Sequence, residues 1–340
     1  MSSRAQGFLR PPSFREKADR PRPPRTGHRS PSRSRLVSMG VAFVVAIAIL
    51  HACDRSGAGP ESAGDAEAAL SEGIAYLSEG DARAALGRFG DAARLDPENA
   101  RVWLETGKAH LSLGENANAI SALERAATLA PADANVFYEL SVARTRAGRL
   151  EKALESYAAA IRIKPDLVTA YINRSAIHFR LGRVEEAIAD CDRAIRLDPY
   201  NPAVLVNRGI YRRRQGDRDG ALADWGEATR IAPQFPGGWV SRAIDRVGAG
   251  ELEAALGDFD HVLSIRPDDP DILESRARVL IALGRREDAI ENLSRVLARS
   301  PRRASAYWER SSCWEALGDT AKAEADRKQA LALDPSLGAR

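Results

Sequence analysis

Residues 168–201 read VTAYINRSAIHFRLGRVEEAIADCDRAIRLDPYN, and three of their positions return at a fixed interval along the chain. Gly182, Ala187 and Pro199 each belong to a column that recurs every 34 residues without an insertion. The alanines keep this step from Ala85 to Ala323, and the prolines keep it from Pro97 to Pro335. The chain is therefore an array of repeats rather than two or three ordinary domains. The glycine column is Gly80, Gly114, Gly148, Gly182, Gly216, Gly250, Gly284 and Gly318.

Each column has a physical reason. The glycine supplies the left-handed residue that a chain needs just past the end of a first helix. The alanine lets a second helix approach the first closely, and the proline stops that second helix. Apolar residues between the columns follow helical spacing, as in Ala187, Ile188, Cys191, Ala194 and Ile195. Each unit is therefore predicted to be a helix-turn-helix hairpin.

The repeat resembles the tetratricopeptide repeat (TPR), W-x2-L-G-x2-Y followed by A-x3-F-x2-A and P. The first unit matches this motif at Gly73, Tyr76, Ala85, Phe89, Ala92 and Pro97. The resemblance implies an all-α, right-handed α-solenoid of eight 34-residue TPR helix-turn-helix repeats. It implies a non-catalytic scaffold that binds another protein, although the fold does not specify which one. The predicted repeats span 66–99, 100–133, 134–167, 168–201, 202–235, 236–269, 270–303 and 304–337.

Two positions of the repeat vary together. The first unit carries Glu72 at position 7 and Arg88 at position 23, and the second and third units lack both charges. We predict that the two positions face each other within a hairpin and form ion pairs that fix its packing. The last five units carry the pairs Arg174/Asp190, Arg208/Asp224, Arg242/Asp258, Arg276/Asn292 and Arg310/Asp326.

The TPR resemblance also implies a concave groove lined by the first helix of each hairpin. Stacked asparagine side chains can hold the backbone of an extended segment, and a row of arginines favours an acidic one. The alternative is that Arg146, Arg180 and Arg214 lie in the last helical turn, where they suit the helix dipole without any ligand. The predicted peptide-binding residues are Tyr138, Arg146, Asn173, Phe179, Arg180, Asn207, Arg213 and Arg214.

The segment before the repeats has a different composition. Residues 1–35 are rich in Arg, Pro and Ser, carry a net charge of +8 and are predicted to be disordered. Residues 36–53 contain the apolar run LVSMGVAFVVAIAILHA and end at Cys53, and residues 54–65 form a predicted linker. An apolar run after a basic region is typical of an export signal, with the arginines on the cytoplasmic side.

The end of this run, Leu50-His51-Ala52-Cys53, resembles a bacterial lipoprotein signal and implies lipidation of Cys53. His51 departs from that pattern. An uncleaved signal anchor and a chance cysteine after an apolar helix remain the alternatives, and the long basic region leaves open whether Met1 is the true start. The first two interpretations predict a membrane-associated protein whose repeats lie outside the cytoplasm, in the periplasm or cell envelope.

Composition argues against several other functions. The net charge of residues 54–340 is −5, which does not favour nucleic-acid binding. The sequence has no HExxH, GxSxG or phosphate-loop motif, and its three cysteines lack metal-site spacing. We therefore predict no enzymatic activity, metal, cofactor or small-molecule substrate. A self-associating structural module and a cytosolic adaptor remain the alternatives to a tethered scaffold.

Overall fold

The fold was obtained as a computed structural model that describes residues 60–339. Within these residues the chain forms sixteen α-helices and one short 3-10 helix, and it contains no strand. The predicted all-α solenoid is therefore confirmed. The expectations for the basic region, the apolar run and Cys53 concern residues 1–59 and lie outside the described residues.

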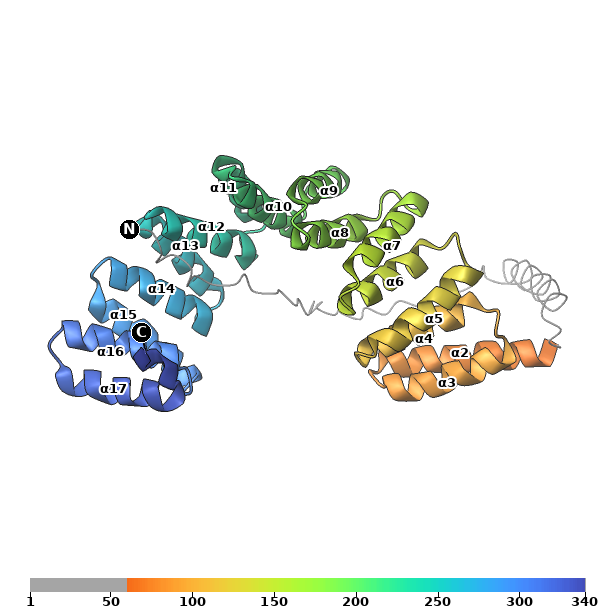
Figure 1. The fold of residues 1–340 in the computed structure, drawn as a ribbon, viewed down its shortest axis with the longest axis horizontal. Helices are drawn as coiled ribbons and strands as arrows, with labels where there is room; N and C mark the ends of the chain where they lie inside the picture. Colours follow the sequence, from red (N-terminus) through yellow and green to blue (C-terminus); the bar gives the residue numbers. More distant parts are fainter. Residues whose placement is uncertain (1–59, 340) are drawn as a thin grey trace, which may run out of the picture. The chain divides into compact units, whose positions relative to one another are not determined.

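The sixteen helices alternate as first and second helices of hairpins, which we number 1 to 8 in chain order (Figure 1). The first helices are α2 (Pro60–Ser78), α4 (Ala100–Ser112), α6 (Ala134–Arg146), α8 (Val168–Arg180), α10 (Pro202–Gln215), α12 (Pro236–Ala249), α14 (Pro270–Ala282) and α16 (Ala304–Ala316). The second helices are α3 (Ala82–Leu95), α5 (Asn116–Leu129), α7 (Leu150–Ile163), α9 (Val184–Leu197), α11 (Arg218–Ile231), α13 (Leu252–Ile265), α15 (Arg286–Arg299) and α17 (Thr320–Leu333). The 3-10 helix η1 (Pro335–Ala339) packs against α17.

The first helix starts earlier than the sequence pattern indicated. Because α2 begins at Pro60, residues 60–65 continue this helix instead of belonging to the expected linker. Proline suits the first helical position, where its fixed φ is already helical and its missing N–H is not needed.

Glycine is required at the turn of all eight hairpins and, in hairpin 5, also inside the first helix. All eight turn glycines have φ between +74° at Gly148 and +98° at Gly216, a conformation that costs other residues strain. Inside α10, a Cβ added to Gly209 would lie 2.4 Å from Nε1 of Trp225 in α11. Because residue 209 has no side chain, the indole of Trp225 can pack directly against the backbone of α10.

The hydrophobic core is divided along the array rather than concentrated in one place. One cluster of buried residues joins Tyr171 of α8 and Cys191 of α9 to Val204 and Tyr211 of α10. Consecutive hairpins meet mainly where a second helix packs on the following first helix, and first helices also contact each other, as α10 does α12. We call the side lined by first helices the inner face. Stability is thus distributed over neighbouring hairpins, as expected for a solenoid.

No helix within residues 60–339 is both long enough and apolar enough to cross a membrane.

Candidate peptide-binding surface

The predicted ion pairs hold the scaffold of the inner face together. Nε and Nη2 of Arg208 donate to the two carboxylate oxygens of Asp224 at 3.0 and 2.6 Å, and Nη1 donates to Asp192 of the preceding hairpin at 2.7 Å. Burial opposes the charge of Arg208, but hydrogen bonds to both aspartates outweigh it and raise the pKa of the guanidinium. The reversed pair of hairpin 1, Glu72 and Arg88, also forms, at 3.1 Å. The same two-bond geometry joins Arg174 to Asp190, Arg242 to Asp258 and Arg310 to Asp326.

Hairpin 7 departs from the prediction. Nε of Arg276 donates to Oδ1 of Asp260 in α13 at 2.7 Å, and no hydrogen bond joins Arg276 to Asn292. A neutral amide attracts a guanidinium less strongly than a carboxylate does, so the arginine turns toward the nearest acid.

A second basic residue, which the covarying pairs did not predict, binds the same carboxylates. Arg212 donates to Asp224 at 3.0 Å, and Arg246 donates to Asp258 at 2.8 Å. Both occupy position 11 of their repeats, which His178 shares in hairpin 4. Burial lowers the pKa of His178, against the opposing effect of Asp190. The recurrence of basic residues at position 11 was the signal that could have revealed this contact.

Two of the predicted binding residues from neighbouring hairpins contact each other. Asn173 in α8 donates from Nδ2 to the hydroxyl oxygen of Tyr138 in α6 at 3.1 Å. The Tyr138 ring also meets the ring of Tyr157 edge-on, with centroids 6.1 Å apart. Both Asn173 and Tyr138 are half-buried, so each serves packing between hairpins 3 and 4 while keeping part of its side chain at the surface.

Three other predicted residues are used mainly within the scaffold. Phe179 is half-buried and stacks on Tyr211. Arg146 donates from Nη1 to the carbonyl oxygen of Leu111 at 2.8 Å, in the last turn of α4. Arg213 forms an ion pair with the buried carboxylate of Asp245 in α12. Arg146 thus adds a contact between α6 and the end of α4, at a carbonyl oxygen that also accepts from the N–H of Gly114.

The remaining three predicted residues keep their polar groups available. Arg180 and Arg214 end the inner-face helices of hairpins 4 and 5, occupy the same position of their repeats and are exposed. Neither they nor the half-buried Asn207 form a hydrogen bond or ion pair with another residue within 60–339. The candidate site therefore narrows from the predicted set to Arg180, Asn207 and Arg214, with Asn173 beside them.

The repeat position that holds asparagine in hairpins 4 and 5 is acidic in hairpins 2 and 3. Glu105 and Glu139 occupy in hairpins 2 and 3 the position that Asn173 and Asn207 hold in hairpins 4 and 5. Glu105 accepts from Lys108 at 2.8 Å, whereas burial raises the pKa of Glu139 against the opposing charge of Lys108. Hairpins 2 and 3 therefore have carboxyl side chains at the position where hairpins 4 and 5 have asparagines. This change from glutamate to asparagine at one repeat position can be read from the sequence alone.

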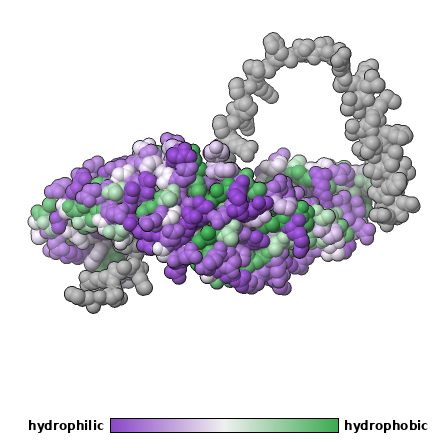
Figure 2. All heavy atoms as spheres, turned by 90° about the horizontal axis from the view of Figure 1, so that it is seen from above, coloured by the Kyte–Doolittle hydropathy of each residue, from purple (hydrophilic) through white to green (hydrophobic). Residues whose placement is uncertain are grey.

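The surface offers little hydrophobic area for a partner. Figure 2 shows a face on which hydrophilic residues predominate and hydrophobic ones form separate patches. Among residues 63–338, the large hydrophobic side chains that are exposed are Tyr76, Leu95, Tyr200 and Leu317. They are distributed over hairpins 1, 4 and 8, so a partner would be held by polar and charged contacts rather than by one apolar patch.

The cysteines and acidic residues of the described part do not converge on a reactive centre. Cys191 and Cys313 are buried free thiols, and burial raises their pKa to about 12 and about 11, which keeps them as inert thiols. No group of three or more His, Cys, Asp and Glu side chains within residues 60–339 is placed to hold a metal ion.

Comparison with known proteins identifies the class of repeat. The tetratricopeptide-repeat family model matches residues 70–134, 107–168, 138–202 and 274–337, which together exceed half of the chain. The chain therefore belongs to the tetratricopeptide-repeat family. Members of this family generally act as scaffolds that bind other proteins. No curated protein matches the sequence.

Solved structures with related folds share little sequence with this chain. The structure of the APC/C hetero-tetramer Cut9–Hcn1 matches with 19% identity and a TM-score of 0.51, over 66% of this chain and 45% of that one. A tetratricopeptide-repeat protein from Parabacteroides merdae ATCC 43184 matches with 20% identity and a TM-score of 0.48, over 80% and 94%. MamA 41-end from Desulfovibrio magneticus RS-1 matches with 18% identity and a TM-score of 0.48, over 50% and 96%. At such identities the similarity concerns the fold alone.

Proposed function

We propose that the protein is a non-catalytic scaffold, exported and tethered to a membrane, whose inner face binds an extended acidic segment of another protein. The observation that carries this proposal is the pair Arg180 and Arg214. Their guanidinium groups are exposed, recur one repeat apart and have no polar partner within residues 60–339. Other arginines on the same helices, such as Arg213, are already neutralised by an acid of the scaffold.

The recognition combines charge with backbone contacts. Asn207 offers a donor and an acceptor that can bind the peptide groups of an extended chain, and Asn173 offers its remaining amide positions. Arg180 and Arg214 then select carboxylates on that chain. Glu105 and Glu139 stand in place of these asparagines in hairpins 2 and 3, so the amide contacts to the segment are confined to hairpins 4 and 5. Because each exposed charge contributes only about 0.2–1 kcal/mol, binding is moderate and weakens with salt.

The test of the binding surface is crosslinking and recovery of the partner from native cells. The full-length Arg180→Glu/Arg214→Glu variant should lose the partner that the wild type recovers. The matched control is Arg125→Glu/Arg302→Glu, which reverses two exposed arginines elsewhere in the array. If both variants retain the same partner, the inner face of hairpins 4 and 5 is not the binding surface. Size measurement across concentration tests the alternative, because self-association predicts a dimer without any partner.

The tether of this proposal rests on the sequence of residues 36–53 alone. A lipoprotein route predicts that the wild type incorporates radiolabelled palmitate and that Cys53→Ser does not. It also predicts that globomycin, which blocks lipoprotein signal cleavage, causes the precursor to accumulate. A membrane-bound protein with an intact N-terminus and no label indicates the uncleaved anchor instead. Recovery of the unlabelled protein in the cytosol would contradict both forms of the tether.

A further inference from the structure

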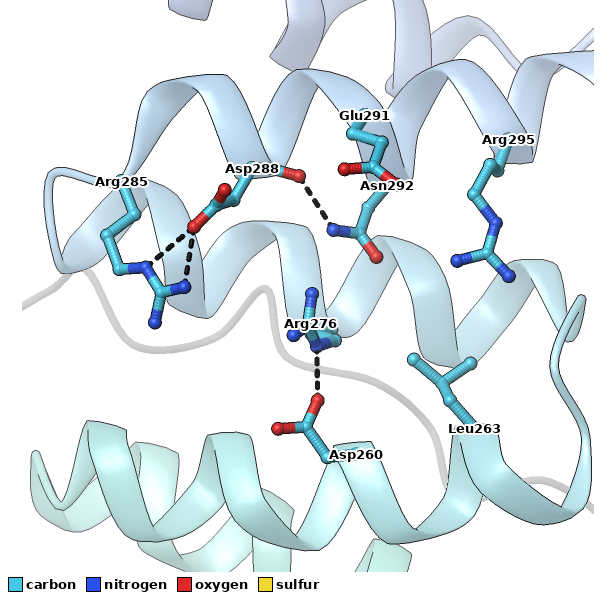
Figure 3. A pocket seen from close by; sticks show the side chains of 8 residues that line it. All are labelled: Asp260, Leu263, Arg276, Arg285, Asp288, Glu291, Asn292 and Arg295. Atoms are coloured by element: carbon cyan, nitrogen blue, oxygen red, sulfur yellow. Dashed lines mark hydrogen bonds and ion pairs between the residues drawn. The ribbon is translucent and has the colours of Figure 1, made fainter.

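A polar cavity lies between hairpins 6 and 7, where the ion-pair pattern fails. The cavity has a volume of about 300 Å³ and lies between α13, α14 and α15. Arg276 extends into it from α14, as Figure 3 shows, and Leu263 provides an apolar part of the wall. It is formed by a different set of residues from the inner-face site of hairpins 4 and 5. A volume of this size holds a small organic molecule.

Hairpin 7 has Asn292 where hairpins 4, 5, 6 and 8 have an aspartate, and one edge of the Arg276 guanidinium is left without a partner within residues 60–339. In hairpins 4, 5, 6 and 8 the equivalent arginine gives two hydrogen bonds to the aspartate at position 23. In hairpin 7 the Nδ2 of Asn292 donates to the carbonyl oxygen of Asp288 at 2.7 Å. Only Nε of Arg276 is engaged, by Asp260, so its Nη1 and Nη2 groups have no partner within residues 60–339. The Arg276 side chain is nevertheless only 19% exposed.

The other charges around the cavity are mostly satisfied. Arg285 donates to Asp288 at 2.6 Å, and Arg295 donates to Asp268 at 3.2 Å and to the carbonyl oxygen of Pro267. Glu291 has no hydrogen bond or ion pair with another residue within 60–339. Apart from the charges that are paired with each other, the lining therefore offers a ligand the guanidinium edge of Arg276 and the carboxylate of Glu291. A guanidinium edge with two parallel N–H groups matches a carboxylate in a two-bond geometry.

The geometry points to a binding site for a small zwitterion of the α-amino-acid type. Its carboxylate accepts from Nη1 and Nη2 of Arg276, beside the amide of Asn292. Its ammonium group is neutralised by Glu291, and a short apolar side chain lies toward Leu263. A simple anion would bind less tightly, because it has no ammonium group for the unpaired carboxylate of Glu291.

The test compares two probes of similar shape on the full-length protein. L-alanine carries both charges, whereas propionate carries only the carboxylate. Saturation-transfer NMR should show saturable binding of L-alanine at least tenfold tighter than that of propionate. Asn292→Asp places a carboxylate on Arg276, as in four other hairpins, and should weaken L-alanine binding at least tenfold. Since this variant restores the common pair, its melting temperature should not fall, which separates lost binding from unfolding.

Several outcomes would overturn this inference. They are the absence of saturable L-alanine binding to the wild type, equal binding of propionate, and unchanged binding by Asn292→Asp. Glu291→Gln provides an independent arm that leaves Arg276 intact. It should reduce the preference for L-alanine over propionate, and an unchanged preference contradicts the assigned role of Glu291.

Discussion

The ring of Phe179 in α8 stacks on the ring of Tyr211 in α10, with centroids 4.5 Å apart and planes inclined by 26°. The two residues belong to first helices of successive hairpins. Their contact therefore stabilises the junction between hairpins 4 and 5, next to the arginines that we assign to binding. Phe179, which the sequence predicted as a ligand contact, thus packs mainly within the scaffold.

Replacement of Phe179 by alanine should lower the free energy of unfolding by about 2 kcal/mol, because it removes a half-buried ring and its stacking contact with Tyr211. Phe179→Leu should cost less than half as much, since most of the apolar contact remains. Urea denaturation followed by circular dichroism measures both values. An alanine variant as stable as the wild type would contradict a packing role for this ring.

Removal of a buried carboxylate should lower the free energy of unfolding more than removal of the asparagine at the same repeat position. Asp224→Ala leaves Arg208 and Arg212 without their shared partner and should destabilise the protein by about 3–5 kcal/mol. Asn292→Ala is the matched control, since Asn292 binds no arginine, and should cost about 1 kcal/mol. Urea midpoints of the two variants test this order, and equal losses would show that the ion pair does not contribute.

Glycine replaced by alanine should have opposite effects at two helical positions. Gly209→Ala places a Cβ against the indole of Trp225 and should destabilise the protein by about 1–3 kcal/mol. Gly257 lies within α13, is exposed and has no atom within 4 Å of an added Cβ. Gly257→Ala should therefore stabilise the protein by up to about 1 kcal/mol. Thermal unfolding of the two variants distinguishes these signs directly.

Glu309 in α16 should make stability depend on pH. Burial raises its pKa to about 7, against the opposing charge of Arg278 and Arg303 and together with that of Glu274. Its Oε1 accepts from Nε of Arg278 at 2.5 Å, while its buried Oε2 accepts no hydrogen bond. Between pH 4.5 and 7 the folded state therefore holds a proton that the unfolded state has lost, so stability falls as pH rises.

The corresponding test uses Glu309→Gln, which removes this titration. Above pH 7 the variant should be more stable than the wild type by at most about 3 kcal/mol, and its stability should change less between pH 4.5 and 7. The exposed residue Glu324 provides the control Glu324→Gln, which should keep the wild-type slope. Parallel pH profiles for all three proteins would rule out Glu309 as the source of the dependence.

Much of the fold could be predicted because each repeat encodes its own local geometry. Gly182 ends a first helix, Ala187 allows close packing and Pro199 follows the second helix, and none of these effects depends on distant residues. The pair of Arg208 and Asp224 was also predictable, because the two positions varied together among the repeats. Periodicity in one sequence thus carried the information that an alignment usually supplies.

The candidate site was less predictable, because an arginine stays free for a ligand only where no acid or carbonyl oxygen of the scaffold lies within reach of it. Arg213 and Arg214 are neighbours in sequence, but only Arg213 meets the buried Asp245 of the next hairpin. Arg146 and Arg180 hold the same repeat position, yet only Arg146 donates to a carbonyl of the preceding hairpin. These differences depend on side-chain distances between hairpins, which the repeat pattern does not contain.

The backward bond from Arg208 to Asp192 has a consequence for the order in which the array folds. Hairpin 4 precedes hairpin 5 both in synthesis and in export, so the carboxylate of Asp192 is available when Arg208 follows. Arg276 reaches back to Asp260 and Arg310 reaches back to Ser294 in the same direction. Each of these later hairpins therefore finds one of its polar partners on chain that has already been made, and the array can grow by ordered addition toward its C-terminus.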